Sequence, residues 1–107
     1  MASGKLGSFD LASSSLTPAY TVPTDNFAVV SVSICNRGNS AVTIRVAVQD
    51  QGVAVGLKDY IEYGTELLAK GVLERTGILM SVGQILHVWA SGPNVSAVVF
   101  GIETSTV

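Results

Sequence analysis

Apolar and polar residues alternate with a period of two along most of the chain, which is the pattern of half-buried β-strands. The clearest runs cover residues 26–36 and 41–49, and both are rich in the β-branched residues that suit a pleated sheet. Residues 36–40 between them, Asn-Arg-Gly-Asn-Ser, tolerate positive φ, so we expect the two strands to form a β-hairpin. The faces expected in the core are Ala28, Val30, Val32 and Ile34 in the first strand, and Val42, Ile44, Val46 and Val48 in the second.

Two strands are expected before residue 26. They cover residues 4–12 and 16–22, and Pro18 in the second is typical of an edge strand because proline has no N–H to donate. Residues 23–26, Pro-Thr-Asp-Asn, predict the turn that leads into the next strand. The N-terminal quarter therefore belongs to the same sheet structure as the rest of the chain.

The middle of the chain contains a predicted loop at residues 50–57 and a short strand at residues 60–63. Tyr60 and Tyr63 point to opposite sides if that strand is regular. Residues 65–71 are read as a strand that ends in a turn at residues 69–71, with a short helical turn as the alternative. The strand is favoured because so short a helix is marginal.

Three more strands follow, at residues 72–81, 84–91 and 95–103, for a total of about eight. Turn residues separate them, at Val82-Gly83 and at residues 91–94. We therefore expect one domain over residues 1–107, with the strands and connector of residues 1–25 included. The predicted fold class is all-β, either an antiparallel β-sandwich or a jelly-roll-like barrel of about eight strands.

The last two strands, read together as a closing hairpin, are apolar on both faces. One face of each is expected in the core, and the other needs a second cover in an antiparallel domain. A neighbouring subunit is one such cover, and an N-terminal strand or long loop of the same chain is the alternative. The residues assigned to the interface are Ile85, His87 and Trp89 on the first strand, and Val98, Phe100 and Ile102 on the second.

The composition supports burial against another molecule. Charged residues make up 13% of the chain, about half the roughly 25% of a soluble domain, and such a surface resists association poorly. A polar but uncharged monomer is the alternative. The net charge of −2 and the absence of a basic cluster argue against nucleic-acid binding. Apolar stretches are too short for a membrane span, and the start has no signal-peptide core.

The residue types that carry chemistry do not form a catalytic pattern. His87 is the single histidine and has no orienting partner near it in the sequence, so we interpret it as a packed or interface residue. Cys35 is the single cysteine, which excludes an intrachain disulfide and is typical of a protein made in a reducing cytoplasm. We read it as a small, semi-buried side chain rather than a reactive thiol. We expect no enzymatic activity and no cofactor.

Two loose clusters have a functional and a structural interpretation. Asp59, Glu62 and Glu66 suggest a cation site, but their spacing fits no calcium loop, and a solvated sheet edge is favoured. We therefore predict no metal. A sugar-binding platform is the functional reading of the aromatic residues, and core or interface packing is favoured for the tryptophan. That candidate platform consists of Tyr20, Tyr60, Tyr63 and Trp89.

Several stretches together resemble a group of small virion structural proteins of tailed bacteriophages, including phages of cyanobacteria. The resemblance implies a β-sandwich present in many copies on the particle, with the virion as its location after assembly in the host cytoplasm. Its implied partners are copies of itself, as a trimer, and the major capsid protein. The stretches are Gly4-Lys5-Leu6-Gly7, Tyr20-Thr21-Val22-Pro23-Thr24, Ile34-Cys35-Asn36-Arg37-Gly38, Val42-Thr43-Ile44-Arg45-Val46, Asp59-Tyr60-Ile61-Glu62-Tyr63, Gly71-Val72-Leu73-Glu74-Arg75-Thr76-Gly77-Ile78 and Ser81-Val82-Gly83-Gln84.

The functional expectation is a non-enzymatic capsid decoration (cement) protein that stabilises the head by binding across capsid subunits. A tail or fibre-associated structural module is the first alternative. A carbohydrate-binding β-sandwich that uses some of the tyrosines and Trp89 is the second.

Overall fold

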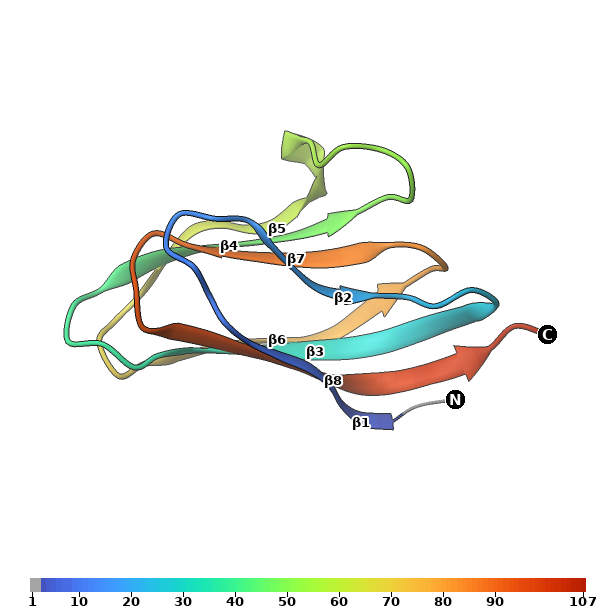
Figure 1. Cartoon of the computed structure of the whole chain (residues 1–107), viewed down its shortest axis with the longest axis horizontal. Coiled ribbons are helices and arrows are strands. Elements are labelled where there is room, and N and C mark those ends of the chain that lie inside the picture. The colour runs from blue at the N-terminus through green and yellow to red at the C-terminus, as the bar shows by residue number, and fades with distance from the viewer. Residues whose placement is uncertain (1–2) are drawn as a thin grey trace.

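The computed structural model describes residues 3–107 and shows an all-β domain of two layers (Figure 1). Within that range no helix has the length and hydrophobicity needed to cross a membrane. A single 3-10 turn, η1 (Leu57–Asp59), lies between the fourth and fifth strands. The strands are β1 (Ser3–Asp10), β2 (Thr17–Thr21), β3 (Asn26–Asn36), β4 (Val42–Gln49), β5 (Tyr60–Leu67), β6 (Val72–Met80), β7 (Ile85–Ala90) and β8 (Val95–Ser105).

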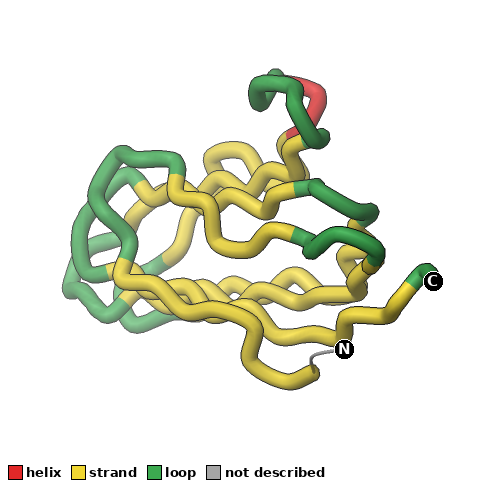
Figure 2. Tube along the Cα trace, turned by 45° about the vertical axis from the view of Figure 1, so that its right-hand side comes forward, coloured by secondary structure: helices red, strands yellow, loops and turns green. Residues whose placement is uncertain are grey.

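Each layer is a four-stranded antiparallel sheet. The first sheet has the strand order β1-β8-β3-β6, and the second sheet has the order β2-β7-β4-β5. The first strand thus pairs with the last, the second with the seventh, the third with the sixth and the fourth with the fifth. This nesting arises when one long antiparallel hairpin is wound into two sheets, and it is the arrangement of a jelly roll. The predicted fold class is confirmed, and Figure 2 shows the connections gathered at both ends of the sandwich.

The core fills the space between the sheets, where alternate side chains of each strand point inward. Burial alternates residue by residue along β3, as the period of two predicts. The inner side chains of the four central strands are each at most 6% exposed. They are Ala28, Val30, Val32 and Ile34 of β3, Val42, Ile44 and Val46 of β4, Leu86, Val88 and Ala90 of β7, and Val95, Ala97 and Val99 of β8.

Polar contacts join the two sheets along both long sides of the sandwich. On one side Arg75 of β6 forms an ion pair with Glu62 of β5, with 3.0 Å between nitrogen and oxygen. Toward the other side the hydroxyl of Tyr20 on β2 donates to the Glu103 carboxylate on β8 at 2.6 Å. Burial, together with this hydrogen bond and the negative charge of Glu103, raises the pKa of Tyr20 above its usual value.

The predicted hairpin between residues 26–36 and 41–49 is wrong, because β3 and β4 belong to different sheets. Among the described residues of this connection none adopts the positive φ on which the hairpin prediction rested. The fully buried Asn36 holds the crossing instead: its amide donates to the carbonyl oxygens of Ser40 at 2.8 Å and Leu67 at 3.2 Å. The apolar faces of β3 and β4 thus pack against each other across the core rather than side by side.

The predicted closing hairpin is wrong for the same reason. β7 lies in the second sheet and β8 in the first, so residues 91–94 carry the chain from one layer to the other. The assignment of the two faces of each strand is nevertheless confirmed, since Leu86, Val88 and Ala90, like Val95, Ala97 and Val99, are fully buried. Consequently the outer faces of β7 and β8 look out on opposite sides of the molecule.

The short strand predicted at residues 60–63 and the strand predicted from residue 65 form one continuous strand, β5, and the chain turns at residues 69 and 70 as predicted. The two tyrosines of β5, however, lie on the same face rather than on opposite faces. The register with β4 slips twice, and Ile61 and Gly64 are the extra residues on β5. The first slip lies between Tyr60 and Tyr63, and their ring centroids are 4.9 Å apart in an edge-on arrangement. Pro18 lies on an edge strand, β2, as predicted.

Candidate functional site

An apolar patch lies on the outer face of the first sheet. Val29 of β3 is directly opposite Leu79 of β6 on one side and Ile102 of β8 on the other. On the same face, Phe27 lies two residues before Val29 on β3, and Phe100 lies two residues before Ile102 on β8. These five residues, which we call the outer patch, are between 37% and 69% exposed. Large apolar side chains left this open in one contiguous group are typical of a contact surface.

Polar residues surround the outer patch. Ser3 and Lys5 of β1 are the register partners of Ile102 and Phe100, and Ser31 and Ser33 continue the outer face of β3. Within residues 3–107 neither the N-terminal strand nor a loop seals the patch, because β1 lies beside β8 in the same sheet rather than over it. An apolar centre with a polar rim is the usual composition of a protein–protein interface.

The edges of both sheets, in contrast, are interrupted. Each of the four edge strands, β1, β2, β5 and β6, has a register shift in which the extra residue lies on the edge strand itself. The extra residues include Leu6 on β1 and Ala19 on β2. A bulge twists an edge away and breaks the row of hydrogen-bonding groups that an added strand needs. The structure therefore favours association through a sheet face over association through an edge.

The outer face of the second sheet is built differently. Arg45 on β4 is directly opposite Tyr63 on β5 and Trp89 on β7. Its guanidinium carbon lies 4.4 Å from the centre of the Tyr63 ring and 4.3 Å from that of the Trp89 ring. A cation over each aromatic face is attracted by the ring quadrupole, so the three side chains hold one another in place. Arg45 of the same chain thus covers part of the Trp89 ring.

The next row of the same face contains His87. Its Nε2 lies 2.6 Å from Oε1 of Gln49, and Gln49 in turn donates from its amide nitrogen to the Val53 carbonyl at 2.8 Å. The Nδ1 atom is buried and has no hydrogen-bond partner among the described residues. Burial lowers the pKa of His87 below its usual value. In residues 3–107 no acidic side chain is hydrogen-bonded or ion-paired to the ring, and its polar partner is the neutral amide of Gln49.

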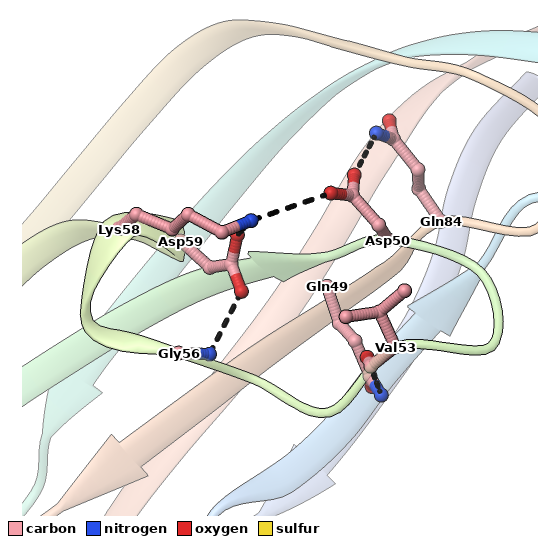
Figure 3. Close-up of polar contacts among 7 residues, drawn as sticks. All are labelled: Gln49, Asp50, Val53, Gly56, Lys58, Asp59 and Gln84. Atoms are coloured by element: carbon pink, nitrogen blue, oxygen red, sulfur yellow. Dashed lines mark hydrogen bonds and ion pairs between the residues drawn. The ribbon is translucent and has the colours of Figure 1, made fainter.

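The loop between β4 and β5 is fastened by polar contacts (Figure 3). Asp50 accepts a hydrogen bond from the Gln84 amide at 2.9 Å and lies 3.9 Å from the Lys58 ammonium. Asp59 accepts from the backbone N–H of Gly56 at 2.8 Å, which closes the turn at η1. The acidic side chains of this loop thus take part in its folding.

The six residues assigned to an interface form two separate groups. Ile85, His87 and Trp89 lie on the outer face of the second sheet, where Arg45 and Gln49 cover part of them. The others lie on the outer face of the first sheet, where Phe100 and Ile102 belong to the outer patch and the half-buried Val98 lies beyond it. The structure therefore brings each group of three together but does not join the two groups.

The sugar platform suggested by the sequence is assembled in part. Tyr60, Tyr63 and Trp89 share the outer face of the second sheet, whereas Tyr20 points into the sandwich. Within residues 3–107 no three His, Cys, Asp or Glu side chains gather in a metal-binding arrangement. A shallow hollow of about 340 Å³ lies by Phe9, Val98 and the Asp10–Arg37 ion pair. Cys35 is the register partner of Ser96 in its wall, whereas His87 lies on the other sheet.

Sequence reasoning missed Val29, Leu79 and Arg45 as parts of these surfaces. The alternation along residues 26–36 places Val29 on the outer face, but only the pairing of β3 with both β6 and β8 brings Leu79 and Ile102 to its sides. The bulges of β5 in turn bring Tyr63 onto the face of Arg45. Strand order and bulges depend on contacts between distant segments, and no local signal reveals them.

Comparison of the chain with protein-family models, with curated proteins and with solved structures found no match in any of the three.

Proposed function

We propose that this protein is a non-enzymatic structural subunit of a bacteriophage virion, of the capsid decoration (cement) type. In this role it stabilises the head by lying across capsid subunits, with the major capsid protein and copies of itself, as a trimer, as its partners. The observation that carries the proposal is the outer patch of Phe27, Val29, Leu79, Phe100 and Ile102, which is open while all four sheet edges are bulged. The low content of charged residues and the resemblance of the sequence to small virion proteins support it.

The size of the outer patch fits a subunit that acts in many copies. Full burial of a large apolar side chain contributes about 1.5–3 kcal/mol. Since each of the five is about half exposed, covering the patch contributes roughly 4–7 kcal/mol by the same rule. The loss of translational and rotational freedom on association costs on the order of 4–15 kcal/mol. One patch alone therefore supports weak, reversible contact, and firm attachment requires several contacts at once.

Imaging of the phage particle tests this function directly. The density of the jelly roll is expected on the outside of the head, at junctions between capsid subunits, with the outer patch turned toward a neighbouring protein. Its copy number is expected to be comparable to that of the major capsid protein. Density confined to the tail or fibres would replace the decoration role with the tail-associated one, and a particle without this chain would refute a virion role.

A binding assay isolates the contribution of the patch. Heads prepared without this chain are mixed with the wild type or with a Leu79→Ser, Ile102→Ser double variant. We expect the variant to bind much more weakly, because it places hydroxyl groups at the centre of the contact. A Val53→Ser, Leu57→Ser variant is the matched control, since these exposed apolar residues lie on the β4–β5 loop. Equal binding by all three proteins would show that another surface makes the contact.

A further inference from the structure

We infer that the outer face of the second sheet is a binding site for an acidic saccharide, whose carboxylate is bound by Arg45 and whose sugar ring lies against the exposed ring of Tyr63, next to Trp89. The site does not depend on the proposed virion function, because the outer patch belongs to the opposite face of the sandwich. It takes up the aromatic platform that the sequence offered as the less favoured reading, adding a charged centre and removing Tyr20.

The guanidinium of Arg45 is held in one place before any ligand arrives. The side chain lies between two rings at 4.4 and 4.3 Å, and all three residues come from adjacent strands in direct register. An arginine at an open surface loses rotamer freedom when it binds an anion. Here that loss has already occurred during folding, so more of the binding energy remains for the ligand.

The hydrogen-bonding capacity of Arg45 is unused. In the part of the chain that the structure describes, the ion pairs involve Arg37, Lys58 and Arg75, and the Arg45 side chain makes no hydrogen bond. Its Nε is buried without a partner, which leaves the terminal nitrogens of this half-buried side chain for a ligand. The rings occupy the faces of the guanidinium, whereas its donors lie in its plane, and a carboxylate binds in that plane through two parallel hydrogen bonds.

The aromatic neighbours indicate a sugar as the carrier of the carboxylate. Tyr63 is 57% exposed, and Tyr60 packs edge-on against it, so aromatic surface continues beyond the arginine along β5. Exposed aromatic rings suit ligands that combine a C–H-rich face with polar groups. A uronic acid has both features, because its carboxylate is attached directly to the sugar ring. A neutral sugar would leave the arginine unpaired, and a free inorganic anion would not use the rings.

The single tryptophan of the chain lies in this site, so its fluorescence reports binding directly. The wild-type protein is titrated with trigalacturonic acid and, in parallel, with its methyl ester, which keeps the rings and removes the charges. We expect a saturable change in Trp89 emission with the acid, and a response to the ester that is about tenfold weaker or absent, because the charged hydrogen bonds are lost. A response of equal strength to both, or none to the acid up to about 10 mM, would overturn the inference.

Variants separate the site from general effects of charge. Arg45→Gln is expected to weaken acid binding by about tenfold, and Tyr63→Ala, which alters a largely exposed side chain, to weaken it without unfolding the protein. Arg37→Gln removes the same charge from the β3–β4 connection, outside the proposed site, and should bind like the wild type. Far-UV circular dichroism verifies the fold of each variant. If Arg45→Gln and Tyr63→Ala both bind as the wild type does, the proposed site is wrong.

Discussion

Gly101 of β8 lies close against the backbone of β3. A Cβ atom at this position would overlap the carbonyl oxygen of Val29 and would lie 2.9 Å from the Cα of Val30. Both neighbours are backbone atoms of a central strand, so they cannot move aside as a flexible side chain does. Glycine is therefore required here by the spacing of the strands and not by its dihedral angles.

The change Gly101→Ala is expected to destabilise the protein by about 2 kcal/mol or more, since the added methyl group separates β3 from β8. Gly56→Ala is the matched control, because a Cβ there meets nothing closer than the Asp59 carboxylate at 3.9 Å and φ is −114°. Urea unfolding of both variants measures the difference. Equal midpoints for the two would contradict the close approach of the strands.

His87 makes the stability of the fold depend on pH. Burial lowers its pKa in the folded protein below the usual 6.5, whereas the unfolded chain titrates near that usual value. As the pH falls below about 6.5 the unfolded state takes up the proton first, so the free energy of unfolding decreases. This decrease continues until the pH passes the lowered pKa of the folded state. Protonation is unfavourable also because the buried Nδ1 has no acceptor among the described residues.

Replacement of His87 by glutamine tests this assignment. Urea midpoints of wild type and His87→Gln are compared between about pH 7.5 and pH 5. Above pH 6.5 the two curves should run parallel, and below it the wild type should lose stability relative to the variant, which cannot be protonated. Parallel curves throughout would show that His87 titrates alike in the folded and unfolded states.

At the scale of elements, one buried side chain fixes the passage from the first sheet to the second. The amide nitrogen of Asn36 donates to the carbonyl oxygens of Ser40, Leu67 and Leu68, and its Oδ1 accepts from the N–H of Gly38 at 2.9 Å. The residue thus joins the β3–β4 connection to the β5–β6 turn. Asn36 should therefore contribute mainly by holding the connection through which the chain crosses from the first sheet to the second.

Asn36→Ala is therefore expected to lower stability by about 2–3 kcal/mol, because buried carbonyl groups lose their donor. The matched control is Asn39→Ala in the same connection, where the side chain is exposed and the change should be within about 0.5 kcal/mol. Thermal or urea unfolding distinguishes them. Similar, small effects of both variants would mean that the crossing does not depend on the asparagine.

The same connection shows what the sequence predicts well and what it does not. The strands and their inner faces follow from local alternation, and β3 and β4 have the predicted core residues except Val48, which is only partly buried. Whether two such strands pair in one sheet or face each other across the core depends on where other strands lie. Residues 36–40 have turn composition in either case, so the hairpin prediction failed although the strand predictions held.

The candidate surfaces were predictable to a similar extent. Phe100 and Ile102 were assigned to an outer face from alternation alone, and they are exposed there. Their grouping with Ile85, His87 and Trp89 failed because it assumed that β7 and β8 are paired. Position along a strand is a local property, whereas membership of a surface requires the order of strands in the sheet.

At the scale of the whole molecule, the two sheets differ in how much of the apolar surface on their outer faces is covered by other side chains of the same chain. On the second sheet Arg45 covers Trp89, and Gln49 contacts His87, so part of the apolar surface is closed from within the chain. On the first sheet the outer patch remains open, and bulges interrupt the edges of both sheets. This difference supports the proposed association through the outer patch on one face of the first sheet.

The most direct measurement is methyl NMR of the wild-type protein as its concentration is raised from about 0.1 mM to about 5 mM, because a contact of this size is expected to have millimolar affinity. The methyl signals of Val29, Leu79 and Ile102 are expected to shift together with concentration. Those of Val53 and Leu57, which are as exposed but lie on the β4–β5 loop, should stay unchanged. If the patch signals do not move, or if patch and loop signals move alike, the outer patch is not the surface through which this protein associates.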